Sequence, residues 1–147
     1  MPIADVCSRK VAVIDRAAKV TEAARVMREA HVGDVIVCEG NERRPVGILT
    51  DRDIVVGLVA LRIDPDTVQV DDVMTPALVT VTEQQGIYET IQLMERYGVS
   101  RLPVVNARGV LIGIVSSADL LALLSREIGS LSRLSDRQHH REKEVRL

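Results

Sequence analysis

A hydroxyl residue followed three positions later by an aspartate occurs twice in this chain, each time directly after a short aliphatic run. The first pair is Thr50 and Asp53, and the second is Ser116 and Asp119, which lies 66 residues later. A carboxylate one turn into a helix can accept hydrogen bonds from both vicinal hydroxyls of a ribose. The free N–H groups at a helix start also favour an anion such as phosphate. The repeat therefore predicts two equivalent sites for a ligand that carries hydroxyl groups and phosphate.

The same spacing also has a purely structural interpretation. A Ser or Thr at the N-cap with an acidic residue at N3, before an apolar run, is close to a capping box. Taken alone, each motif could serve only as a helix cap and have no role in ligand binding. The ligand hypothesis depends on the duplication, because both copies follow the same glycine and the same kind of strand, at residues 47–49 and 113–115.

The duplication extends over most of the chain. Apolar positions upstream of the motifs repeat at a constant offset of 67: Val20, Ala24, Met27, Val32 and Val37 align with Ile87, Ile91, Met94, Val99 and Val104. The offset falls to 66 after the loop at 39–45, and one insertion in a loop is what a duplicated fold unit tolerates. Two copies are too few for a solenoid. The sequence therefore predicts a pseudo-twofold pair that buries one surface between its halves.

Each copy has the periodicity of a β-α-β-β-α unit, so the predicted fold class is α/β (α+β). In the first copy we expect strands at 11–14, 35–38 and 46–49, with helices at 20–31 and 51–61. In the second we expect strands at 78–81, 102–105 and 110–115, with helices at 86–97 and from about 117. The predicted domains are a first repeat at 3–62, a second repeat at 63–125, and a helical or partly disordered tail at 126–147.

The last helix has an apolar stripe that outruns its counterpart in the first copy. Leu121, Leu124, Ile128 and Leu131 continue at three- and four-residue spacing, and we expect the end to fray from about Asp136. Two heptads are too few to predict a coiled coil. The stripe could pack back on the module or contact another protomer.

Composition excludes several classes of function. The chain of 147 residues has a formal net charge of −2, with Tyr88 and Tyr97 as its only aromatic side chains. Nucleic-acid binding usually needs a basic face or aromatic platforms, so we expect no nucleic-acid partner. No secretory start and no apolar run of about 18–20 residues occur, so we expect a cytoplasmic protein without a membrane partner. Cys7 and Cys38 form no CxxC pattern, and we expect no metal site.

Three segments, in this order and spacing, resemble a CBS domain, which is named after cystathionine β-synthase: residues 72–76, 98–105 and 113–120. The first copy matches at 47–54 and along its amphipathic helix, so the resemblance covers about residues 3–125. It implies a tandem CBS pair, or Bateman module, whose two small sheets pack face to face. Many such pairs bind adenosine compounds in two clefts related by pseudo-symmetry.

The resemblance also implies the residues of each composite cleft. The aspartate of each motif would hold the ribose, and the Ser or Thr would lie near the phosphate. One cleft would comprise Thr50, Asp53, Thr75, Leu78, Val79, Ser100 and Arg101. The other would comprise Ser116, Asp119, Ser8, Lys10, Val11, Val13, Gly33 and Asp34. Arg101 aligns with Asp34, so we expect a phosphate to prefer the cleft of Thr50 and Asp53.

The resulting hypothesis is a non-catalytic regulatory sensor that binds AMP, ATP, NAD or a similar adenine nucleotide. We expect it to form a homodimer and to act on an effector protein that the sequence does not identify. The alternative is a ligand-independent protein–protein interaction or dimerisation module, in which the motifs only cap helices. An enzyme is not expected, because no nucleophile, base and orienting acid can be nominated from the spacing, and His31 is the only histidine within the repeats.

Overall fold

The computed structural model describes residues 1–76 and 79–146, and it contains two three-stranded sheets. The first sheet has the order β1-β2-β3, formed by β1 (Val13–Asp15), β2 (Asp34–Glu39) and β3 (Arg44–Thr50). The second has the order β4-β5-β6, formed by β4 (Val81–Thr82), β5 (Arg101–Val105) and β6 (Leu111–Ser116). In both sheets the first two strands are parallel and the last two antiparallel. The predicted α/β fold class with two similar repeats is confirmed.

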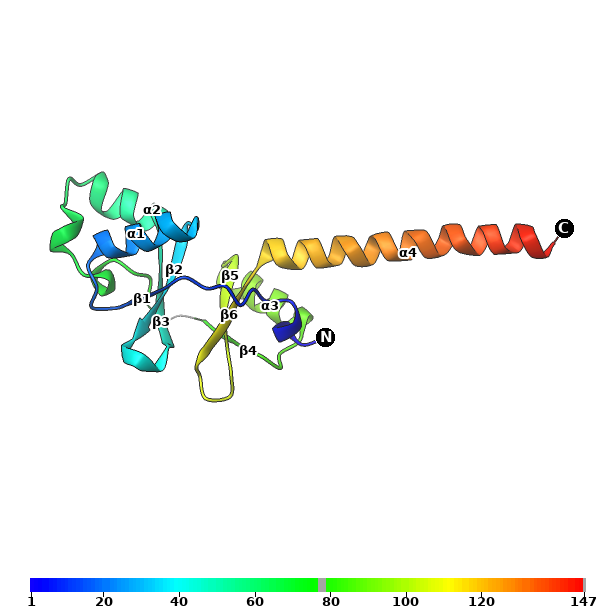
Figure 1. The fold of residues 1–147 in the computed structure, drawn as a ribbon, viewed down its shortest axis with the longest axis horizontal. Helices are drawn as coiled ribbons and strands as arrows, with labels where there is room; N and C mark the ends of the chain where they lie inside the picture. Colours follow the sequence, from blue (N-terminus) through cyan, green and yellow to red (C-terminus); the bar gives the residue numbers. More distant parts are fainter. Residues whose placement is uncertain (77–78, 147) are drawn as a thin grey trace.

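Helices connect and flank the strands as the periodicity predicts (Figure 1). The helices are α1 (Val20–Ala30), α2 (Asp51–Ile54), α3 (Ile87–Tyr97) and α4 (Ser117–Val145). Short 3₁₀ turns occupy Ile3–Asp5, Gly40–Glu42, Pro65–Thr67 and Val70–Asp72. The helix predicted at 51–61 is shorter than expected as an α-helix, because its second half, Val55–Val59, is π-helical. Adjacent β-branched valines followed by Gly57 weaken the α-helical geometry there.

Each repeat has its own core, and a third cluster joins the two sheets. Val35, Val37 and Leu49 lie in the first core, and Val104 and Val115 in the second. Between the sheets, the buried residues Ile36, Cys38 and Leu111 pack with the partly buried Val11, Val13, Ile48 and Ile114. The two sheets therefore contact each other through their aliphatic faces.

The repeats also exchange their leading segments. Residues 2–8 lie beside the second repeat, where Ile3 is fully buried in its core and Ser8 pairs with Ile114 through two backbone hydrogen bonds of 2.9 Å. Figure 1 shows the N-terminus beside α3. The equivalent segment at 70–75 packs on the first repeat, and Thr75 pairs with Ile48 through bonds of 2.9 and 3.3 Å. Each core is thus completed by a segment that precedes the other repeat.

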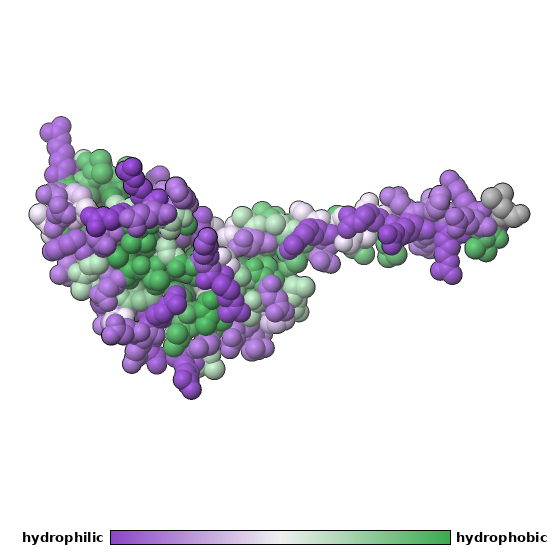
Figure 2. Space-filling view, in the orientation of Figure 1, coloured by the Kyte–Doolittle hydropathy of each residue, from purple (hydrophilic) through white to green (hydrophobic). Residues whose placement is uncertain are grey.

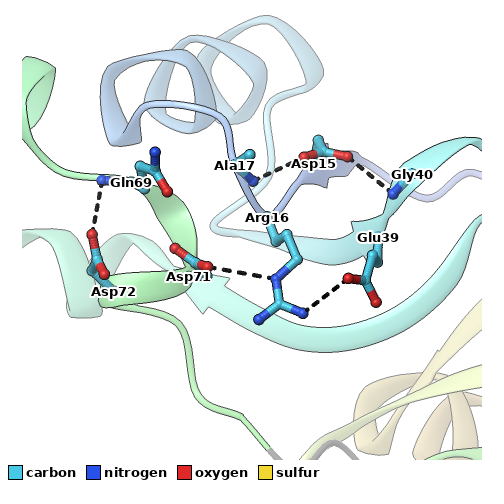
Figure 3. Close-up of polar contacts among 8 residues, drawn as sticks. All are labelled: Asp15, Arg16, Ala17, Glu39, Gly40, Gln69, Asp71 and Asp72. Carbon is cyan, nitrogen blue, oxygen red and sulfur yellow. Dashed lines mark hydrogen bonds and ion pairs between the residues drawn. The ribbon is translucent and has the colours of Figure 1, made fainter.

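Polar contacts fasten the second exchanged segment to the first repeat (Figure 3). The Arg16 guanidinium lies 3.5 Å from the Asp71 carboxylate and 3.4 Å from the Glu39 carboxylate. The backbone N–H of Asp71 donates to the carbonyl of Arg16 at 3.0 Å. Beside it, the Asp15 carboxylate accepts hydrogen bonds from the N–H groups of Ala17 and Gly40, which holds the loop after β1.

The repeated glycines allow the exchanged segments to cross the last strand of each sheet. A Cβ at Gly113 would lie 2.8 Å from both the Ser8 carbonyl oxygen and the Cys7 sulfur. A Cβ at Gly47 would lie 2.9 Å from the Thr75 carbonyl oxygen. These separations are shorter than van der Waals contact, so both positions require a residue without a side chain.

The last helix, α4, projects away from the two repeats as a single rod (Figure 1). Its 29 residues give a length of about 43 Å. The helix extends beyond Asp136, from which we expected fraying, to Val145. Only Leu120 and Leu123 of this helix are buried. The stripe does not pack back on the module: Leu121, Leu124, Ile128 and Leu131 are 64, 43, 67 and 67% exposed. In Figure 2 the projecting part is mainly hydrophilic, with scattered hydrophobic side chains.

Candidate ligand-binding site

Both repeated motifs form complete capping boxes. The Thr50 hydroxyl accepts a hydrogen bond from the Asp53 N–H at 3.1 Å, and the Asp53 carboxylate accepts one from the Thr50 N–H at 2.9 Å. Ser116 and Asp119 repeat this arrangement with the same two distances. The structural interpretation of the motif is therefore correct. It does not exclude a ligand, because each carboxylate uses only one oxygen, Oδ2, in its capping bond.

The two helix starts differ in charge. The N–H of Asp51 donates to the Gly33 carbonyl, and the N–H of Ser117 donates to the Ser100 carbonyl. At α2, the Asp51 carboxylate also accepts a hydrogen bond from the next N–H, that of Arg52, at 2.8 Å. A carboxylate therefore occupies the anion-favouring end of α2, whereas α4 has Ser117 at the equivalent position.

A cavity of about 320 Å³ lies at the start of α4, between the two repeats. The second repeat contributes Ser116, Asp119, Arg101 and Ile114, and the first contributes a larger set: Lys10, Val11, Ala12, His31, Val32, Gly33 and Asp34. The cavity thus combines half-buried Asp119 with two cations and an aliphatic wall. Its volume lies within the usual range for small-molecule sites, roughly 300–1,000 Å³.

An ion pair joins the repeats inside this cavity. Arg101 Nε lies 3.0 Å from Asp34 Oδ2, and the side chains are 50 and 15% exposed. Arg101, which we predicted for the cleft of Thr50 and Asp53, instead lines the cavity of Ser116 and Asp119 in this structure. We expected a phosphate to prefer the first cleft because Arg101 and Asp34 would charge separate clefts oppositely. That expectation loses its basis, because the two side chains form an ion pair with each other.

The structure brings together six of the eight residues predicted for the second cleft: Ser116, Asp119, Lys10, Val11, Gly33 and Asp34. The other two lie beside it. Ser8 uses its backbone to pair with Ile114, and its hydroxyl accepts a hydrogen bond from the Lys10 N–H at 3.3 Å. Val13 packs between the sheets.

The residues predicted for the first cleft are placed less completely. Thr50 and Asp53 start α2, and Thr75 pairs with Ile48 on the adjacent strand. Val79 packs against the second core. The Ser100 carbonyl accepts a hydrogen bond from the Ser117 N–H at the start of α4. Leu78 lies outside the described residues.

Sequence reasoning missed four residues of the cavity: Ala12, His31, Val32 and Ile114. His31 adopts a left-handed conformation at the C-cap of α1 (φ 54°), which turns the chain toward β2. The available signal was a histidine between the end of the helix predicted at 20–31 and Gly33.

Both cysteines are free thiols, and burial raises the pKa of Cys7 and of Cys38. Because the thiolate is the reactive form, Cys38, which is 5% exposed, should resist a maleimide at neutral pH until the protein unfolds. Mass spectrometry with and without urea would measure this, and rapid labelling of native Cys38 would contradict it.

No group of three His, Cys, Asp or Glu side chains suited to a metal ion occurs among the residues that the structure describes. Within those same residues, no helix is long and apolar enough to cross a membrane.

A family model described as CBS domain matches the chain twice, at residues 3–60 and 70–126. The chain belongs to the CBS domain family. This CBS pair is 35% identical over 119 residues to the uncharacterized protein MK0525 of Methanopyrus kandleri, a match of 81% of this chain and 60% of that protein. The chain therefore spans less than two thirds of that relative. Hypoxic response protein 1 of Mycobacterium tuberculosis is 34% identical over 116 residues, which are 79% of this chain and 80% of that protein.

Solved structures share the fold of this CBS pair. CBS domain protein PAE2072 from Pyrobaculum aerophilum, which was solved in complex with AMP, is 26% identical and gives a TM-score of 0.74. The match covers 82% of this chain and 90% of that chain. The predicted resemblance to a tandem CBS pair is thus confirmed.

Proposed function

We propose that this CBS pair is a non-catalytic sensor of an adenine nucleotide and that the cavity of Ser116 and Asp119 is its principal site. The observation that carries the proposal is the meeting of Asp119, Lys10 and Arg101 around one cavity. Asp119 offers a carboxylate oxygen to ribose hydroxyls, and the two cations suit a phosphate. The complex of PAE2072 with AMP supports the same ligand class.

The aliphatic wall explains how a base could bind in a chain with two aromatic residues. Val11, Val32 and Ile114 line the cavity from both repeats. The flat faces of a purine can be buried between such side chains, and the favourable free energy is about 25 cal/mol per Å² of apolar surface removed from water. AMP, ATP and NAD share the adenosine part, so they are the ligands to compare.

A thermal-shift titration with adenosine, AMP, ATP and NAD tests the proposal. A ligand that binds only the folded protein raises its stability by about 2.7 kcal/mol at a hundredfold excess over Kd. We expect at least one of the four to raise the melting temperature. If none does so at millimolar concentration, the alternative of a ligand-independent interaction module would be favoured.

We further propose that the CBS pair forms a homodimer through apolar surface that includes α4. Ile128, Leu131 and Leu134 are 67, 67 and 61% exposed on the projecting helix. A helical segment that lacks tertiary contacts is marginal in water, so a partner would stabilise this one. A second copy offers the same apolar side chains, and twofold pairing would cover both sets at once.

Truncation after Ser125 should weaken the dimer roughly tenfold or more, because it removes the exposed side chains of Ile128, Leu131 and Leu134. Truncation after Ser135 is the matched control, since it keeps the stripe and removes only the charged end. Analytical ultracentrifugation of both variants and the full chain would measure the change. A full-length chain that stays monomeric at high micromolar concentration would contradict the dimer.

A further inference from the structure

The ion pair between Asp34 and Arg101 lines the cavity that the proposed ligand would occupy. These residues occupy equivalent positions, at the first residue of β2 and the first residue of β5. Among the described residues, theirs is the one ion pair that joins the two sheets. Asp34 is the more buried partner, with 15% of its side chain exposed.

The charges of the cavity are balanced without a ligand. Lys10 and Arg101 contribute two positive charges, and Asp34 and Asp119 contribute two negative charges. Asp119 is committed to the helix start of α4 through its bond to the Ser116 N–H. Asp34 is therefore the anion that neutralises the guanidinium, which is the charge-assisted contact that a phosphate could also make.

We infer that Asp34 is a specificity-determining residue that competes with the ligand's phosphate for Arg101. A phosphate-bearing ligand must displace the Asp34 carboxylate, and a displaced carboxylate remains as a like charge beside the phosphate. Adenosine has no group that needs Arg101, so it leaves the pair intact. Asp34 thus lowers the affinity for adenine nucleotides selectively, and displacement removes the ion pair between the sheets. This inference rests on the proposed function for the identity of the ligand.

Calorimetric titration of Asp34→Asn with AMP and with adenosine tests the inference. We expect AMP to bind about tenfold more tightly than to wild type, because one nearby like charge is removed. Adenosine affinity should change less than about twofold, since it makes no charged contact. In Arg101→Gln the affinity for AMP should fall, whereas the affinity for adenosine should stay the same. In the double variant, the increase in AMP affinity that Asp34→Asn causes should disappear.

Asp71→Asn is the matched control, because it removes the partner of Arg16 in an ion pair of 3.5 Å outside the cavity. It should leave both affinities unchanged. Asp34→Ser serves as a second variant, expected to shift AMP in the same direction, if the asparagine variant melts before the titration temperature. Equal changes for AMP and adenosine in the Asp34 variants would overturn the inference.

Inorganic phosphate separates the inference from the proposed function. If neither adenosine nor AMP binds any variant, the proposed function fails. The inference still stands if inorganic phosphate raises the melting temperature of Asp34→Asn more than that of wild type and Arg101→Gln abolishes the difference. It falls if phosphate acts equally on wild type and Asp34→Asn.

Discussion

Replacement of Asp119 by alanine should reduce the affinity for AMP and for adenosine alike, by about a hundredfold. The estimate corresponds to two charge-assisted hydrogen bonds from a ribose, which both ligands carry. In the free protein Asp119 Oδ2 accepts the Ser116 N–H, whereas Oδ1 takes part in no hydrogen bond within the described residues. Isothermal titration of wild type and variant with both ligands measures the loss.

The matched control is Asp53→Ala, which removes the equivalent carboxylate from α2. The substitution removes the equivalent capping bond, which should lower the free energy of unfolding by about 0.5–2 kcal/mol. Binding at the cavity of Asp119 should be nearly unchanged. This comparison separates helix capping from ligand binding. An Asp119→Ala protein that binds both ligands as wild type does would leave the motif with a capping role alone.

Gly113→Ala should destabilise the fold by about 1–3 kcal/mol, because the new methyl group has no space. Its Cβ would lie 2.8 Å from the Ser8 carbonyl oxygen, and backbone cannot give way as a flexible side chain can. The crossing segment at 2–8 would have to move off β6. Urea denaturation would measure the loss, and hydrogen exchange should show weakened protection of the Ser8 and Ile114 amides.

Gly129→Ala is the control, since it makes the same substitution on the projecting part of α4. A Cβ there meets only the end of the Arg133 side chain, at 3.5 Å. Higher helix propensity should stabilise α4 locally by roughly 0.5–1 kcal/mol. The same chemical change is therefore expected to have opposite signs at the two positions. Wild-type stability in Gly113→Ala would show that the segment at 2–8 contributes little to the fold.

The elements that depend on local periodicity were predictable from sequence. The helix expected at 20–31 is Val20–Ala30, and the paired strands expected at 102–105 and 110–115 are Arg101–Val105 and Leu111–Ser116. Amphipathic spacing and β-branched runs determine such elements directly. The length of α4 was not predictable in the same way, because its distal residues have no apolar face that periodicity can detect.

The position of Arg101 illustrates what alignment of two repeats leaves open. Sequence offset identifies Arg101 and Asp34 as equivalent, and equivalent residues suggest separate, corresponding clefts. Residues close to a pseudo-twofold axis instead face their own counterparts, so these two meet at 3.0 Å. Only the packing of the two sheets determines how near the axis a residue lies. Composite cavity residues such as His31 were missed for the same reason.

The exchange of leading segments between repeats has a consequence for the order in which the chain can fold during synthesis. Residues 2–8 are synthesised more than a hundred residues before their partners around Ile114. The segment at 70–75 follows its own partners at once and can complete the first core while translation continues. The Ile3 side chain is buried in the folded protein. During synthesis it must therefore remain exposed to solvent and accessible to chaperones until β6 has been made.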